Sequence, residues 1–209
     1  MKKIVLIVGA LAFLSFGITL TKSEIKEFEK ECEAGNFEAC GAAGIFYEHP
    51  VELGGSASDR DYNKTLYYFK KACDGNLYAA CLEIGAMYVR EEGVKADYKK
   101  AMKLFNKACK GGEMEACSNL GFMYQYGKGV KVDKIRAIEY YKKACNAENW
   151  GGCGNLAVIL EESGDKASAV QYYKKSCELG KNEEDLFNPE KNVLQRFCKR
   201  YEILKKLAD

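Results

Sequence analysis

The ten cysteines are the residues of this 209-residue chain whose chemistry is easiest to interpret. Cysteines bind zinc through Cys-x-x-Cys spacing or together with histidines, but no Cys-x-x-Cys occurs and His49 is the only histidine. We therefore expect disulfides, with no metal site and no cofactor. Four successive pairs are eight residues apart and a fifth pair is 21 apart: Cys32/Cys40, Cys73/Cys81, Cys109/Cys117, Cys145/Cys153 and Cys177/Cys198.

A second pattern with chemical meaning is Ser-x-x-Lys, which occurs at Ser23/Lys26 and Ser163/Lys166. Serine enzymes that open lactam rings place such a serine on a packed helix and also carry Ser-Asp-Asn and Lys-Thr-Gly elements. Neither tripeptide is present. Ser23 follows the apolar amino-terminal segment closely and Ser163 falls in an expected turn, so chance explains both matches. No catalytic residue is predicted.

The amino-terminal segment has the pattern of an export signal. Met1-Lys2-Lys3 is basic, and residues 4–20 are uncharged and mostly apolar. This is typical of a signal peptide, which we assign to residues 1–21 without a defined cleavage site. An uncleaved anchor is the alternative, but this apolar stretch is short for a membrane span of about 20 residues. The cysteine pairs agree with a secreted or periplasmic location.

The net charge of the chain excludes some classes of partner. Loss of Lys2 and Lys3 with the signal peptide would lower the formal net charge from +2 to 0. A neutral chain has no bulk attraction for nucleic acid or for anionic lipid. We therefore expect neither nucleic acid nor, after signal cleavage, a membrane as a partner.

The cysteine pairs recur with a period of 32 to 41 residues, which is typical of a helical solenoid. In each repeat, helix A carries the second cysteine of a pair, as in residues 115–126, and helix B runs to the next cysteine. An aspartate can cap helix B through the amides of its first turn. Such aspartates stand twelve residues before four of the cysteines, at Asp61, Asp97, Asp133 and Asp165.

The same geometry predicts how the cysteines pair. Eight residues place both members of a pair beside the tight turn between one helix B and the next helix A, within the Cα distance that a disulfide needs. We therefore predict that all five pairs are disulfides, the last across an enlarged turn. The expected fold is an all-α stack of four to five helix pairs over residues 22–209, closed by a capping helix at 190–207.

The strongest repeat has the motif Leu120-Gly121-x-x-Tyr124-x-x-Gly127-x-Gly129-Val130-x-x-Asp133, then Ala137 and Tyr140-Tyr141-x-Lys143-Ala144-Cys145. This motif resembles the Sel-1-like repeat, a relative of the tetratricopeptide repeat. With its paired cysteines, the chain is also similar to the secreted, cysteine-rich Hcp-type proteins. This resemblance implies a right-handed α–α superhelix with one disulfide per repeat. It also implies either peptide or protein binding in a concave groove, or β-lactam binding with weak hydrolysis, since many members are labelled β-lactamases.

The candidate ligand groove is the face of helix A beside the core face. Asparagines there could hold a peptide backbone, because an amide both donates and accepts hydrogen bonds, or they could simply satisfy neighbouring backbone groups. Charged residues would select charge, and aromatic residues would form an apolar wall. The predicted groove residues are Glu83, Arg90, Asn119, Phe122, Tyr126 and Asn155.

These observations predict a secreted, disulfide-bonded scaffold that binds a peptide, a protein or a cell-wall-like ligand. A weak β-lactam hydrolase is the alternative. Two further patterns are interpreted structurally. The lysines before the cysteines, such as Lys174-Lys175, are expected to form a solvated face. Most tyrosines at repeat positions are expected to pack in the core, namely Tyr67, Tyr68, Tyr140, Tyr141, Tyr172 and Tyr173.

Overall fold

The computed structural model of the chain describes residues 20–51, 53–181 and 191–207, and these residues form helices and turns without any strand. Apart from its last two residues, the segment assigned to the signal peptide lies outside the described residues. The chain divides into two compact units, Met1–Gly111 and Gly112–Asp209. The predicted all-α fold of disulfide-linked helix pairs is confirmed.

In the first unit, each α-helix packs on the next one along the chain. A short 3-10 helix, η1 (Ala57–Asp59), lies in the long loop after α3. The α-helices of the first unit are α2 (Lys22–Glu33), α3 (Phe37–Glu48), α4 (Tyr62–Asp74), α5 (Tyr78–Arg90) and α6 (Tyr98–Lys110).

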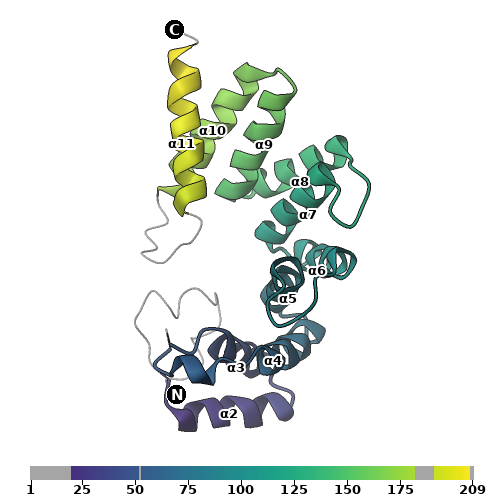
Figure 1. Ribbon diagram of the computed structural model, residues 1–209, viewed down its shortest axis with the longest axis vertical. Coiled ribbons are helices and arrows are strands. Elements are labelled where there is room, and N and C mark those ends of the chain that lie inside the picture. The colour runs from purple at the N-terminus through teal and green to yellow at the C-terminus, as the bar shows by residue number, and fades with distance from the viewer. Residues whose placement is uncertain (1–19, 52, 182–190, 208–209) are drawn as a thin grey trace. The chain divides into compact units, whose positions relative to one another are not determined.

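In the second unit, α9 packs on α10 and α10 packs on α11, so the last three helices lie side by side (Figure 1). Phe197 of α11 is buried between Trp150 and Tyr173, with ring centroids 6.3 Å and 6.0 Å away. The helices of this unit are α7 (Met114–Tyr126), α8 (Lys134–Asn146), α9 (Trp150–Glu162), α10 (Lys166–Gly180) and α11 (Lys191–Lys206).

The repeated aspartates cap helix B as predicted. Asp133 accepts a hydrogen bond from the backbone amide of Arg136, and Asp97 accepts one from that of Lys100. Asp61 and Asp165 make the equivalent contacts at the start of α4 and α10. Each carboxylate thus satisfies amides that have no partner within the helix.

Within each pair, a glycine of helix A receives an aromatic ring of helix B. A Cβ atom on Gly121 would lie 2.6 Å from the Tyr141 ring, and one on Gly85 would lie 2.5 Å from the Phe105 ring. Both rings are buried. A side chain at either glycine would therefore displace the ring that fills the core between the two helices.

Four predicted cysteine pairs are disulfides whose Cα atoms lie 4.5–5.1 Å apart. They are Cys32–Cys40, Cys73–Cys81, Cys145–Cys153 and Cys177–Cys198. Cys109 and Cys117 are disulfide-bonded as well. Each short bridge spans the turn between one helix B and the next helix A, so it joins consecutive repeats.

Two lysines also connect consecutive repeats. Lys107 donates to the carbonyl of Cys73 at 2.6 Å, and Lys175 donates to that of Cys145 at 3.0 Å. Each lysine stands two residues before a cysteine and binds a carbonyl at the carboxyl end of the preceding helix B, where the helix dipole favours a cation. The expectation that these lysines form only a solvated face is therefore wrong for Lys175.

No helix within the described parts of the chain combines the length and the hydropathy that crossing a bilayer would require.

Candidate ligand-binding surface

One face of α7 exposes two of the predicted groove residues, both aromatic. Phe122 is 42% exposed and Tyr126 is 49% exposed, and their ring centroids lie 4.6 Å apart. Asn119 is half-buried on the same face, because spacings of three and four residues repeat on one side of a helix. Tyrosine is enriched among the residues that supply most of the binding energy of protein interfaces. This face can therefore contact both apolar and polar groups of a ligand.

Asn155 lies on α9, which packs beside α7. Its Nδ2 atom donates to Oγ of the buried Ser118 at 3.3 Å and so connects the two helices. An amide side chain has two donor hydrogens and an acceptor oxygen. The contact with Ser118 agrees in part with the alternative that the asparagines satisfy neighbouring groups, although here the neighbour is a side chain.

Glu83 and Arg90 lie on α5, in the first unit, whereas the other four predicted groove residues lie in the second unit. Arg90 is 3.9 Å from Glu83 and 2.9 Å from Glu92. A charged ligand would therefore compete with these ion pairs for Arg90. That Glu83 and Arg90 select the charge of a ligand stays a prediction.

A buried acid lies near this ion-pair group. Glu48, the last residue of α3, is only 6% exposed. Burial raises the pKa of Glu48 to about 7; Arg90 and Arg60 oppose this shift, and Glu92 adds to it. A carboxyl group that is partly neutral near pH 7 makes the first unit sensitive to pH.

The two Ser-x-x-Lys matches lie on exposed residues, whereas the serine of a lactam-opening enzyme lies on a packed helix. Ser163 ends α9 and its hydroxyl donates to the carbonyl of Leu160 at 2.8 Å, while Lys166 begins the next helix. Ser23 is exposed near the start of α2. No group of three or more potential metal ligands occurs among the residues that the structure describes.

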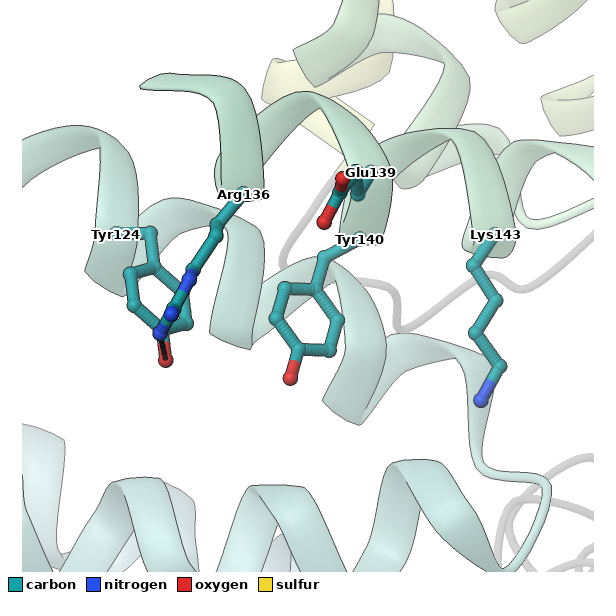
Figure 2. A pocket seen from close by; sticks show the side chains of 5 residues that line it. All are labelled: Tyr124, Arg136, Glu139, Tyr140 and Lys143. Carbon is teal, nitrogen blue, oxygen red and sulfur yellow. Dashed lines mark hydrogen bonds between the residues drawn. The ribbon is translucent and has the colours of Figure 1, made fainter. Parts of the chain in front are cut away.

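The structure also shows a pocket that the sequence interpretation missed. It has a volume of about 260 Å³ and lies on α7 and α8. Tyr140 lines this pocket and is only half-buried, so its assignment to the core was wrong; Tyr67, 49% exposed, was also misassigned. Tyr68, Tyr141 and Tyr173 are buried as expected. The lining residues, drawn in Figure 2, are Tyr124, Arg136, Glu139, Tyr140 and Lys143.

Comparison with known proteins identifies the repeat. The Sel1 repeat matches residues 51–77, 79–113, 115–149 and 159–181. No curated protein matches the chain. One similar solved structure is a Sel1 repeat protein from Oxalobacter formigenes, with 26% sequence identity and a TM-score of 0.68, covering 75% of this chain and 62% of that one.

A second similar structure is c5321, a protective antigen present in uropathogenic Escherichia coli strains displaying an SLR fold. It is 27% identical with a TM-score of 0.67, covering 75% of this chain and 33% of that one. Helicobacter pylori cysteine rich protein B is 29% identical over 64% of this chain and 92% of that one, with a TM-score of 0.48. The chain spans less than two thirds of the first two proteins.

The repeat matches cover more than half of the 209 residues, and the two structures with the higher TM-scores carry the same repeat or fold in their descriptions. The capped helix pairs and the glycine–aromatic contacts described above recur with that period. This chain belongs to the Sel1 repeat family.

Proposed function

We propose that this protein is an exported binding scaffold that holds an extended peptide against the exposed face of α7 and α9. The observation that carries the proposal is the exposed Phe122–Tyr126 pair, with Asn119 on the same face and Asn155 on the neighbouring helix. Repeat proteins commonly bind their partners through surfaces formed by successive helices. We refer to these four residues as the α7/α9 face.

The chemistry of the α7/α9 face fits a peptide better than a small polar ligand. Phe122 and Tyr126 offer apolar surface to a ligand side chain, and the Tyr126 hydroxyl can also hydrogen-bond. Asn155 uses one donor on Ser118, and its amide has a second donor hydrogen and an acceptor oxygen. An extended backbone presents a donor and an acceptor in each residue, which this amide can match.

Export is part of the proposal because the disulfides require an oxidising compartment. We assign residues 1–21 to the signal peptide and 22–209 to the mature repeat array, in the periplasm or outside the cell. Expression of the full chain in a bacterium, followed by amino-terminal sequencing of the periplasmic fraction, tests this assignment. Recovery of the uncleaved chain with alkylatable thiols would contradict it.

Binding can be tested with calorimetry on the oxidised chain, using a pool of unstructured peptides and a separate sample of soluble cell-wall fragments. Replacement of both aromatic residues, Phe122→Ala with Tyr126→Ala, should weaken peptide binding at least tenfold, because exposed aromatics supply much of the energy of such contacts. The matched control is Ile135→Ala on α8, which removes an apolar side chain that is 75% exposed outside this face.

Equal affinity for the parent and the double variant, or no binding of any peptide, would overturn the proposal. Binding of the cell-wall fragments alone would assign the α7/α9 face to that ligand instead. Hydrolysis of a β-lactam, which the resemblance to Hcp-type proteins implies, has no supporting arrangement at Ser23 or Ser163. Turnover of a chromogenic lactam above that of a heat-treated control would support β-lactam hydrolysis instead.

A further inference from the structure

The first unit contains a carboxylate that two tyrosines and a lysine hold. Glu29, on α2, accepts hydrogen bonds from the hydroxyl of Tyr47 at 2.7 Å and from that of Tyr68 at 3.1 Å. Lys64 Nζ lies 3.5 Å from the same carboxylate oxygen and donates to the Tyr47 hydroxyl at 2.9 Å. We call Tyr47, Tyr68 and Lys64 the first tyrosine cluster; Glu29 is its occupant.

The geometry of this cluster shows how it stabilises a negative charge. The Tyr47 and Tyr68 rings are stacked, with centroids 6.0 Å apart, and Lys64 lies 4.4 Å from the centroid of the Tyr47 ring. Burial alone would raise the pKa of Glu29, but the two tyrosine hydrogen bonds and the charge of Lys64 lower it overall. Lys64 donates to the Tyr47 hydroxyl, and this hydroxyl in turn donates its own hydrogen to the Glu29 carboxylate.

The second unit places an equivalent set at the same repeat positions, Tyr124, Tyr140 and Arg136, which we call the second tyrosine cluster. In both clusters the first tyrosine stands seven residues after the second cysteine of one pair. The second tyrosine stands five residues before the first cysteine of the next pair, and the cation stands nine residues before that same cysteine. The Tyr124 and Tyr140 rings are again stacked, 5.7 Å apart with an interplanar angle of 10°.

The cation of the second tyrosine cluster also repeats the contacts of its counterpart. Arg136 donates to the Tyr124 hydroxyl at 3.3 Å, and its guanidinium carbon lies 5.5 Å from the centroid of the Tyr124 ring. Burial raises the pKa of Tyr140, which keeps its hydroxyl protonated and able to donate. In Figure 2 the hydroxyls of Tyr124 and Tyr140 point to the same side as the Lys143 amine.

The remaining repeats lack this combination. At the corresponding positions, the middle repeat has Tyr88 and Lys100, but Leu104 replaces the second tyrosine. The last helix pair has Leu160 and Ser168 in place of the first tyrosine and the cation. The combination therefore occurs twice, once around Glu29 and once around the 260 Å³ pocket.

The sequence also differs at the repeat position of Glu29. Glu29 stands three residues before Cys32, and the residue three before Cys109 is the neutral Asn106. The pocket itself is lined by two cations, Arg136 and Lys143, and by one anion, Glu139. Asp133 lies 3.3 Å from Arg136, so a ligand carboxylate in this pocket would compete with Asp133 for the guanidinium.

We propose that the second tyrosine cluster is a binding site for a carboxylate that a ligand supplies, in the way that Glu29 supplies one to the first. The Tyr124 and Tyr140 hydroxyls donate to the carboxylate, and Arg136 orients the Tyr124 hydroxyl and adds charge. The carboxylate can come from an acidic side chain of a peptide or from a peptide carboxyl terminus. Because about 200° of helix rotation separates Tyr124 from Phe122, this site lies on another side of α7.

The test uses the full-length oxidised chain with labelled tyrosine rings observed by NMR. Blocked glutamate and blocked glutamine form the first pair of probes. N-acetyl-alanine and its amide form the second pair, which reports on a terminal carboxylate. We expect ring resonances of Tyr124 and Tyr140 to shift saturably with the acids and not with the amides. The acid that binds with the higher affinity, blocked glutamate or N-acetyl-alanine, shows whether the site prefers a side-chain or a terminal carboxylate.

Three substitutions at two positions of α8 test the roles of the side chains. Arg136→Gln should weaken binding of the acid at least tenfold, whereas Arg136→Lys should retain it within about threefold, because the first tyrosine cluster uses a lysine. Tyr140→Phe should weaken binding while keeping the stacked ring. The matched control is Lys100→Gln, which removes the corresponding cation from the repeat that has Leu104, and it should bind as the parent does.

Several results would overturn the proposal. They are equal shifts with acids and amides, parent-like binding by Arg136→Gln, or an equal loss in Lys100→Gln. Arg136 is exposed and Tyr140 half-buried, so the variants should fold, and a thermal melt checks this. These variants leave Phe122 and Tyr126 unchanged. Failure of the carboxylate proposal therefore leaves the peptide proposal for the α7/α9 face intact, and failure of the peptide proposal leaves the carboxylate proposal intact.

Discussion

The two tyrosine clusters have the same register, stacking and cation, and they differ in what lies against them. In the first unit Glu29 accepts hydrogen bonds from both tyrosine hydroxyls and pairs with the charge of Lys64, so the cluster joins α2 to α3 and α4. In the second unit the set lines a pocket. The comparison shows that the same tyrosine and cation positions can form an internal contact in one repeat and line a pocket in another.

The largest expected effect distinguishes the disulfides of the two units. The Cys177–Cys198 bridge in the second unit closes a 21-residue separation, whereas Cys32–Cys40 in the first closes one of eight. Loss of unfolded-state entropy makes the former worth about 3.3 kcal/mol and the latter about 2.5 kcal/mol. Urea unfolding of the two Cys→Ser double variants measures both. A larger loss for the shorter bridge would contradict the entropy argument.

The second prediction concerns a buried position that differs between the units. Eight residues after the second cysteine of a pair, α3 in the first unit has Glu48 and α7 in the second has Gln125, and both are buried. The pKa of Glu48 in the fold, about 7, lies above its ordinary value of 4.5, so the neutral acid favours folding. The stability that it contributes is fully present below pH 4.5 and is lost as the pH rises to 7.

Glu48→Gln should therefore be more stable than the parent at pH 8, by up to about 3 kcal/mol, and no more stable at pH 4. Unfolding by urea across this pH range measures the difference. His49 lies 3.6 Å from Glu48, and histidine can titrate in the same window. Both chains should therefore carry His49→Asn. Parallel pH profiles for the two chains would refute the role of Glu48.

The third prediction tests the occupied cluster directly. Glu29→Ala should destabilise the first unit by about 2 kcal/mol, because it leaves the half-buried Tyr47, the buried Tyr68 and Lys64 without their shared acceptor. Acetate should raise the melting temperature of this variant more than chloride at equal ionic strength, by binding where the side chain was removed. Glu33→Ala, which removes an exposed partner of Lys71, is the control. Equal responses to both salts would argue against a carboxylate site.

The smallest expected effect is at the carboxyl ends of α5 and α7. Both helices end in a left-handed residue, Glu91 with φ 62° in the first unit and Gly127 with φ 68° in the second. Only glycine adopts this conformation without a steric cost. Glu91→Gly should stabilise the chain by about 0.5–1 kcal/mol and Gly127→Ala should destabilise it by about 1 kcal/mol. Thermal unfolding that shows no gain for Glu91→Gly would contradict this assignment.

The sequence predicted the features that depend on local spacing. Asp133 caps α8 and Cys145 pairs with Cys153 because both contacts lie within a few residues of a helix end. The ring of Tyr141 packs on Gly121 because the period of the repeat places them in one helix pair. Such contacts recur wherever the spacing recurs, and the period therefore reveals them.

The spacing of the repeat could not predict contacts that depend on which side chain a neighbouring helix contributes. Tyr68 and Tyr140 occupy the same repeat position, yet one is buried against Glu29 and the other lines a pocket. Likewise, Glu83 and Arg90 pair across two turns of α5, which their positions on a predicted groove did not reveal. Alignment of the repeats position by position, with attention to charge, was the signal that could have identified the second tyrosine cluster.

The placement of the short bridges has a consequence for a chain exposed to proteases. Cys145–Cys153 spans the turn between α8 and α9, so a cut in that turn leaves the two fragments covalently joined. No bridge spans residues 127–133, between α7 and α8, where a cut separates the fragments even under oxidising conditions. Under oxidising conditions the chain thus stays covalently joined after nicks in alternate turns, and its resistance to cleavage depends on the turns inside each helix pair.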